Sequence, residues 1–261
     1  MFAKLLKHDC RAMFKYWWVA ALSTVVFAVI AGVCIDIVTV SYTAYDSIQA
    51  VANMLLVFSL IAILIFPVLS AVMMFKRFNK HFFSDEGYLT FTLPVSKSSL
   101  LASKLVTAVI FAILSIKVLE IDILLCYTVS GENLFDMLED VFEMMSLWYH
   151  LDYHIASNVI FNFVILAAVA SAVAFVFLCI TLANLIAKRR KLLVGIGIFY
   201  GVQIVIAILL RIIAISGALD FIEYKLDATT IALGVLAVTV IFGAASYLLN
   251  LYLLDKRLNL E

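Results

Sequence analysis

Long apolar runs alternate with short polar stretches along the whole chain. The apolar runs lie at about 17–38, 48–75, 99–126, 154–187, 192–216 and 228–254. Each run supplies the ~20 residues that a helix needs to cross the ~30 Å hydrocarbon core of a bilayer. Backbone groups in lipid must bond within their own segment, whereas a spanning barrel would show alternating strands of ~10 residues. The pattern predicts an all-α polytopic membrane protein, with residues 1–261 forming one transmembrane domain of six helices.

The composition agrees with this class. Apolar residues make up 66% of the chain and charged residues 14%, whereas an average soluble domain has about half and a quarter. These values exclude a disordered chain, a disulfide-rich secreted module and an ordinary cytosolic enzyme. The net charge is zero, so no global field favours nucleic acid. We expect a multi-pass protein of the cell (plasma) membrane, with lipid around it.

Lysine and arginine set the expected orientation. Fifteen of the eighteen lie before the first run, between the second and third runs or at the start of the third (Lys104), between the fourth and fifth, or after the sixth. The opposite loops hold only Lys225, and Lys117 and Arg211 lie inside runs. Because cytoplasmic loops carry the excess of these residues, both termini are predicted to be cytoplasmic.

The first sixteen residues are basic and amphipathic. They predict a helix lying in the cytoplasmic interface, with Trp17 and Trp18 anchoring the first span at headgroup depth. The alternative is a plain extension of the first span.

The longest outer loop, residues 127–153, is acidic and has no lysine or arginine. Its helical spacing predicts an amphipathic helix on the outer leaflet. His150, Asp152 and His154 match no known ligand spacing, so we expect no metal site there. Cys34 and Cys126 lie near the outer ends of their spans. They are interpreted as small buried residues, and a disulfide between them stays open.

The stretch 76–98 is too long for a simple turn between helices. A basic helix is predicted to continue to Phe83, where Ser84-Asp85-Glu86-Gly87 breaks it, and Ser96 is expected to cap the third span. Between them lie aromatic and leucine side chains outside any span. This pattern predicts a surface for a soluble partner, and the alternative is a segment folded back onto the membrane interface.

The residues Glu86-Gly87-Tyr88-Leu89-Thr90-Phe91-Thr92-Leu93-Pro94-Val95-Ser96 resemble the corresponding loop of bacterial ABC-2-type exporter permease subunits. The resemblance implies a cytoplasmic coupling segment that docks on a separate ATPase subunit. We expect the docking residues to be Asp85, Glu86, Tyr88 and Phe91. A second permease copy, identical or related, would complete the pathway. One departure is that the larger outer loop here joins spans three and four, rather than spans five and six.

The chain has no G-x-x-x-x-G-K-[ST] motif, so we expect no enzyme activity and no bound cofactor in this subunit. ATP and magnesium would bind the partner ATPase. Gly195, Gly197 and Gly201 are interpreted as positions where the fifth span packs closely against another helix. Two pairs of small residues in the fourth span, Ala167 with Ser171 and Ala168 with Ala172, predict a similar close-packing seam.

Polar side chains within the runs give two further hypotheses. The uncharged ones either line a pathway or bond between helices; they are Gln49, Asn53, His154, Asn158, Asn162 and Gln203. The charged ones, placed by helix rise near the outer boundary, either pair and snorkel there or form an outer gate; they are Asp36, Lys117, Glu120 and Arg211.

Two other functions stay open. A secondary transporter would want ionisable residues near the membrane midplane and an internal repeat, and the sequence shows neither. A non-transporting scaffold or immunity protein would use the cytoplasmic segment only for binding.

Overall fold

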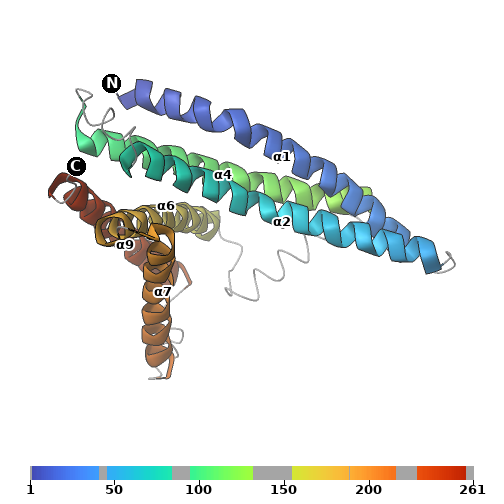
Figure 1. Cartoon of the computed structure of the whole chain (residues 1–261). Coiled ribbons are helices and arrows are strands. Elements are labelled where there is room, and N and C mark those ends of the chain that lie inside the picture. Colours follow the sequence, from blue (N-terminus) through green and yellow to red (C-terminus); the bar gives the residue numbers. More distant parts are fainter. Residues whose placement is uncertain are drawn as a thin grey trace. The chain divides into compact units, whose positions relative to one another are not determined.

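The computed structural model describes residues 2–40, 46–83, 95–131, 155–187, 189–215 and 228–256 (Figure 1). Each of these ranges holds one long α-helix. The helices are α1 (Phe2–Val40), α2 (Asp46–Phe83), α4 (Lys97–Val129), α6 (Ile155–Ile186), α7 (Lys191–Ile215) and α9 (Ala228–Lys256). Five of them, α1, α2, α6, α7 and α9, are long and apolar enough to cross a membrane. In the part of the chain that the structure describes, the predicted all-helical architecture is confirmed and its membrane-like character is shown; α4 is not among the five helices.

Helix α1 joins the basic N-terminal segment to the first apolar run without a break. Its 39 residues extend for about 58 Å at 1.5 Å per residue, which exceeds the ~30 Å hydrocarbon core. This continuity is the arrangement expected of a plain extension of the first span.

The chain forms two compact units. The N-terminal unit comprises Ala3–Lys76 and Ile110–Trp148, and the C-terminal unit comprises Arg77–Val109 and Tyr149–Glu261 together with the first two residues. Helices α2 and α4 therefore each contribute to both units.

Small residues on α1 allow close packing in the N-terminal unit. Ala21, Ala28 and Ala31 are buried along the helix. A Cβ atom built on Gly32 would lie 2.7 Å from Cβ of Val129 on α4, closer than real Cβ contacts come. In Figure 1, α1, α2 and α4 run side by side. Close backbone approach of this kind substitutes for the hydrophobic effect, which does not drive helix association in lipid.

In the C-terminal unit, α6 packs along α9 and, over a shorter length, against α7. The seam expected at Ser171 is present, because a Cβ atom on Gly243 of α9 would lie 3.0 Å from Cβ of Ser171. Gly195 faces Ala183 of α6 at 3.4 Å. Gly197 and Gly201 meet no atom within 4 Å, so one of the three glycines on α7 packs against a described neighbour.

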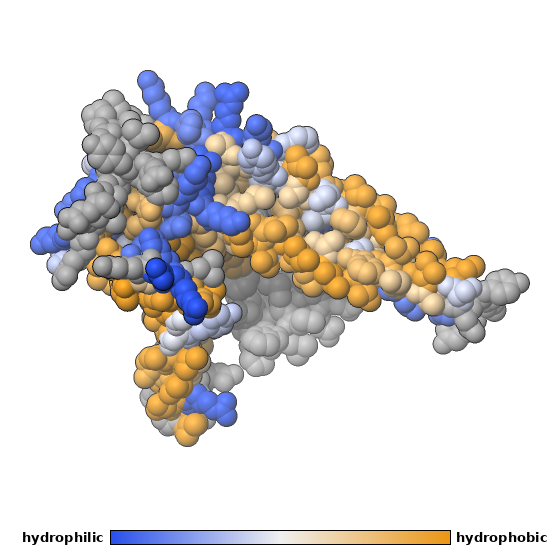
Figure 2. Space-filling model, viewed as in Figure 1, coloured by the Kyte–Doolittle hydropathy of each residue, from blue (hydrophilic) through white to orange (hydrophobic). Residues whose placement is uncertain are grey.

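The outward surface of the helices is strongly apolar. The most apolar stretch of α7 buries none of its residues, and that of α9 buries 6%. Figure 2 shows this surface as broad hydrophobic areas along the helices. A helix that is apolar on its exposed face is typical of a lipid environment.

Candidate coupling site at the base of residues 84–94

Residues 84–94 connect α2 to α4, and they lie outside the described residues together with the expected docking residues Asp85, Glu86, Tyr88 and Phe91. The helix ends on either side are described. Helix α2 ends at Phe83, as the sequence predicts. Helix α4 starts at Lys97, where the backbone N–H of Ser99 donates to the hydroxyl of Ser96 at 3.4 Å. The predicted cap at Ser96 is confirmed, and both ends of the segment are set by local sequence.

The end of α2 is held by α6. The ring of Phe78 stacks on that of Phe177, with centroids 4.0 Å apart and planes 7° from parallel. One turn further along α2, Phe82 is fully buried. The side-chain amide of Asn184 on α6 donates to the amide oxygen of Asn79 at 2.9 Å. Apolar and polar contacts together fix the helix end from which the segment departs.

The start of α4 is held by α9. The ammonium of Lys97 lies 2.9 Å from a carboxylate oxygen of Asp255. The hydroxyl of Tyr247 donates to the backbone carbonyl of Ser98 at 3.1 Å, a carbonyl in the first turn of α4. Leu101 of α4 and Leu254 of α9 are fully buried, at 0% and 1% exposure. The start of α4, where residues 84–94 end, is therefore a second anchored point.

A buried hydrogen bond links the two supporting helices. The hydroxyl of Thr181 on α6 donates at 2.8 Å to the amide oxygen of Asn250 on α9, and both residues are buried. We call the set of contacting residues at this end the coupling base; it consists of Phe78, Asn79, Lys97, Ser98, Phe177, Thr181, Asn184, Tyr247, Asn250 and Asp255. All of them belong to the C-terminal unit.

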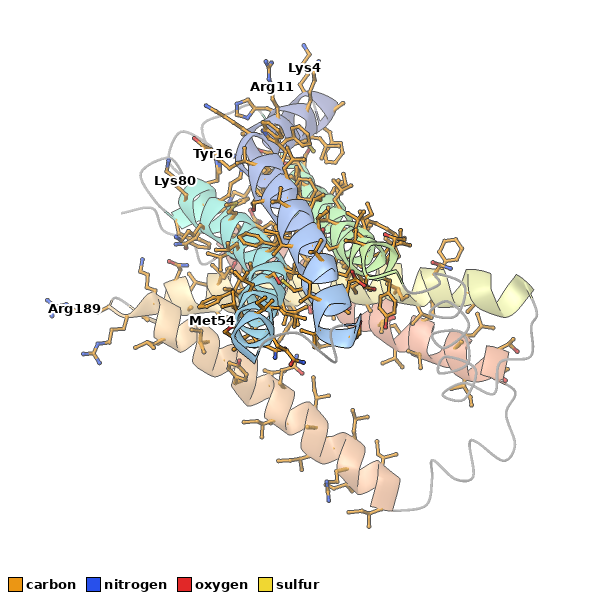
Figure 3. All side chains as sticks on the ribbon, turned by 90° about the vertical axis from the view of Figure 1, so that its right-hand side faces the viewer. Lys4, Arg11, Tyr16, Met54, Lys80 and Arg189 are labelled. Carbon is orange, nitrogen blue, oxygen red and sulfur yellow. The ribbon has the colours of Figure 1, made fainter. Side chains whose placement is uncertain are left out.

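Three exposed basic side chains lie close in sequence to members of the coupling base. The loop before α7 contributes exposed Arg189 and Arg190, and α9 ends at exposed Lys256. Figure 3 shows Arg189 extending away from the ribbon. Exposed cations of this kind suit contact with anionic headgroups or with acidic side chains of a partner.

The residues expected to line a pathway fall into both units. Gln49 is half-buried and Asn53 is exposed on α2, in the N-terminal unit. Asn162 on α6 and Gln203 on α7 are exposed in the C-terminal unit. The side chains of His154 and Asn158 lie outside the part that the structure describes. The described side chains among them, Gln49, Asn53, Asn162 and Gln203, are divided between the two units.

The residues expected at an outer gate are also distributed. Lys117 forms an ion pair with Glu120 on its own helix at 2.8 Å, and both side chains are more than half exposed. Arg211 is exposed on α7 of the C-terminal unit, and Asp36 is exposed near the end of α1. The pair Lys117–Glu120 is an exposed ion pair between residues one turn apart on one helix.

The interior of the N-terminal unit holds a polar layer that sequence reasoning missed. Ser115 of α4 accepts a hydrogen bond from the indole N–H of Trp17 at 3.0 Å and lies 2.8 Å from the hydroxyl of Ser70 on α2. The Trp17 ring packs between Phe66 and Phe111. The headgroup anchor expected at Trp17 is therefore wrong, because this side chain is buried. Trp18 is exposed and remains available for that role.

The two cysteines considered for a disulfide are both buried and free. The thiol of Cys126 donates to the backbone carbonyl of Ala28 at 3.3 Å. One turn before it on α4, Asp122 is fully buried, and neither of its carboxylate oxygens has a hydrogen-bond partner among the described residues. A serine, a tryptophan or an aspartate in an apolar run has no signal that separates an interior from a lipid-facing position.

Within the described residues, no group of three or more histidine, cysteine, aspartate and glutamate side chains could hold a metal ion. Comparisons with protein-family models, with curated proteins and with solved structures gave no match to this chain.

Proposed function

We propose that the chain is the membrane-spanning permease subunit of an ATP-driven exporter and works with a separate ATPase subunit. The observation that carries the proposal is the anchoring of both ends of residues 84–94, at Phe78–Phe177 and at Lys97–Asp255. The similarity of Glu86 to Ser96 to the ABC-2-type coupling loop supports the same function.

The coupling base provides a mechanism for transmission. A segment joined to α2 and α4 through loosely packed ends would bend when a partner moved it. Here stacked rings, an amide pair and a buried Thr181–Asn250 bond tie the two helix ends to α6 and α9. Movement of a docked ATPase would therefore shift these helices as a packed group, in the manner of rigid-body alternating access. ATP binding must favour one of the two states by differential affinity.

The sequence of this chain indicates which subunit would bind ATP. Nothing in its sequence cradles a phosphate, so ATP and magnesium would bind the partner ATPase, with Asp85, Glu86, Tyr88 and Phe91 forming the contact. The apolar face of α7 would meet lipid or a second permease chain.

Docking is tested by two double variants, one in the expected cytoplasmic segment and one in the expected outer loop. The tagged chain is solubilised from native membranes, and the ATPase that co-purifies is quantified. We expect E86K with Y88A to lower its recovery about tenfold or more, the effect of losing ~1.4 kcal/mol of binding. The matched control is E139K with Y149A, in the predicted outer loop, which should leave recovery unchanged. Equal recovery from both paired variants would contradict the proposal.

Transmission is tested separately at the coupling base. Reversing one charge, K97E or D255K, should keep the ATPase bound while uncoupling ATP hydrolysis from export. The double variant K97E/D255K restores an attractive pair and should recover coupling. A double variant no better than either single one would show that this pair does not transmit movement.

A secondary transporter is the second candidate, and one observation favours it: the buried carboxyl of Asp122. The two functions are separated by whether export from vesicles requires ATP or follows an imposed ion gradient. A scaffold would show neither dependence.

A further inference from the structure

The buried carboxyl of Asp122 lies deep in the apolar part of the N-terminal unit. On α4 it is seven residues beyond Ser115, which is level with Trp17. The neighbouring hydroxyl on α1 is that of Thr24, also seven residues beyond Trp17. At 1.5 Å per residue, Asp122 lies about 10 Å past Trp17 and about 18 Å before the level of Asp36. An ionisable group at such a position is a functional candidate by default.

The helices packed around Asp122 supply no counter-charge. Residues 16–35 of α1 and 47–75 of α2 contain no aspartate, glutamate, lysine, arginine or histidine. On α4 itself, Lys117 is exposed and already pairs with Glu120. The titratable neighbour Cys126 donates its proton to the carbonyl of Ala28. An ionised carboxylate without a partner is strongly disfavoured in such surroundings.

The hydrogen bond that Thr24 already makes favours the protonated form of the Asp122 carboxyl over the ionised form. Its hydroxyl donates to the backbone carbonyl of Ala21 at 2.8 Å, so its one proton is already used. The oxygen keeps an acceptor lone pair, which a carboxylic acid O–H can satisfy and a carboxylate cannot. A bound metal cation would need several oxygen ligands, whereas Cys126, one turn along α4 from Asp122, belongs to an apolar cluster with Ala28 and Ile63.

We propose that Asp122 is a proton-binding site, occupied when α1 and α4 are packed together. Binding converts the carboxylate to the neutral acid, and release returns one proton and leaves the anion. Because the anion is stable only where water reaches it, release requires α1 and α4 to separate. Proton occupancy is thereby linked to closure of the N-terminal unit, and closure is weakened as the pH rises. This inference is independent of the proposed ATPase docking.

Infrared spectroscopy of the full chain in lipid nanodiscs tests the site directly. We expect a carbonyl stretch of a protonated carboxylic acid at neutral pH that shifts with ¹³C-aspartate labelling, disappears in D122N and persists in E120Q. The isotope shift in the wild type makes the test independent of whether D122N folds. Absence of the aspartate acid band, or its persistence in D122N, would overturn the proposal.

Thermal unfolding provides a second test. The midpoint should fall as the pH rises in the wild type and in E120Q, and fall less in D122N, which mimics the neutral acid. Sodium should leave the wild-type midpoint unchanged relative to an equal concentration of choline. A sodium-dependent rise that D122N abolishes would overturn the proposal and assign the site to a metal cation.

Discussion

The indole N–H of Trp17 donates a hydrogen bond to the hydroxyl of Ser115, 98 positions later in the chain, at 3.0 Å. Ala28 and Cys126, another hydrogen-bonded pair between α1 and α4, are also 98 positions apart. A constant separation shows that the two helices run parallel in a fixed register. Lys117 is therefore level with residue 19 of α1, about 25 Å short of Asp36 at 1.5 Å per residue. The register separates these two residues, which the sequence placed at one depth.

Ser115 is the residue whose loss should cost the N-terminal unit most. Its oxygen accepts from Trp17, contacts Ser70, and donates to the carbonyl of Phe111 at 2.8 Å. S115A leaves buried donors without an acceptor, so we expect a destabilisation of about 2 kcal/mol or more in detergent unfolding. The control is S23A, an exposed serine on α1, which should stay within about 0.5 kcal/mol of the wild type. Equal effects of the two variants would show that the polar layer contributes nothing.

Two glycine-to-alanine substitutions should change thermal stability in opposite directions. G32A should disrupt packing of α1 on α4, because the added Cβ would meet Val129 at 2.7 Å and the carbonyl oxygen of Cys126 at 2.8 Å. G201A adds a methyl group where nothing lies within 4 Å, and should be neutral or stabilising by up to ~1 kcal/mol through helix propensity. The thermal midpoints of the two variants should move in opposite directions. A G32A midpoint at or above that of G201A contradicts the close contact.

The α6–α9 bond should behave as a buried polar pair. N250A leaves the Thr181 hydroxyl with one acceptor, the backbone carbonyl of Phe177 at 3.0 Å, and creates a cavity where the amide was. We expect a loss of about 1–3 kcal/mol for N250A, but a smaller loss for T181V with N250L, because replacing both partners leaves no unsatisfied group. Unfolding of the two variants in one detergent compares them. A loss for the double variant as large as that for N250A would contradict a stabilising bond between the two side chains.

Helix existence was predictable because it depends on local composition. The end of α2 at Phe83 and the cap at Ser96 follow from short-range chemistry that any reader of the sequence can see. The coupling base was not predictable, since Lys97 meets Asp255 across 158 positions and neither residue is unusual in its own neighbourhood.

The interior of the N-terminal unit illustrates the same limit. An apolar run surrounds Trp17 and Trp18 alike, yet the fold buries the first and exposes the second. Asp122 and Glu120 are two residues apart and point to different environments, one buried and one exposed. Only the helix register, set by long-range contacts, decides which side of each helix faces the interior.

The exposed charges of α4 and α7 should contribute little. Lys117 pairs with Glu120 at the surface, and such pairs give about 0.2–1 kcal/mol. We expect K117M with R211M to retain wild-type export and a stability within about 1 kcal/mol of the wild type, measured in vesicles and in detergent. Loss of export or increased leak in a folded double variant would support the gate hypothesis.

The side of the membrane on which residue 88 lies tests the proposed function most directly. A chain with its four cysteines replaced carries either Y88C or, as the control, E139C in the predicted outer loop. A membrane-impermeant thiol reagent is applied to intact cells and to permeabilised cells. Labelling of E139C in intact cells, with labelling of Y88C only after permeabilisation, is the predicted result. Labelling of Y88C from outside intact cells would contradict a cytoplasmic docking segment and the ATPase partnership built on it.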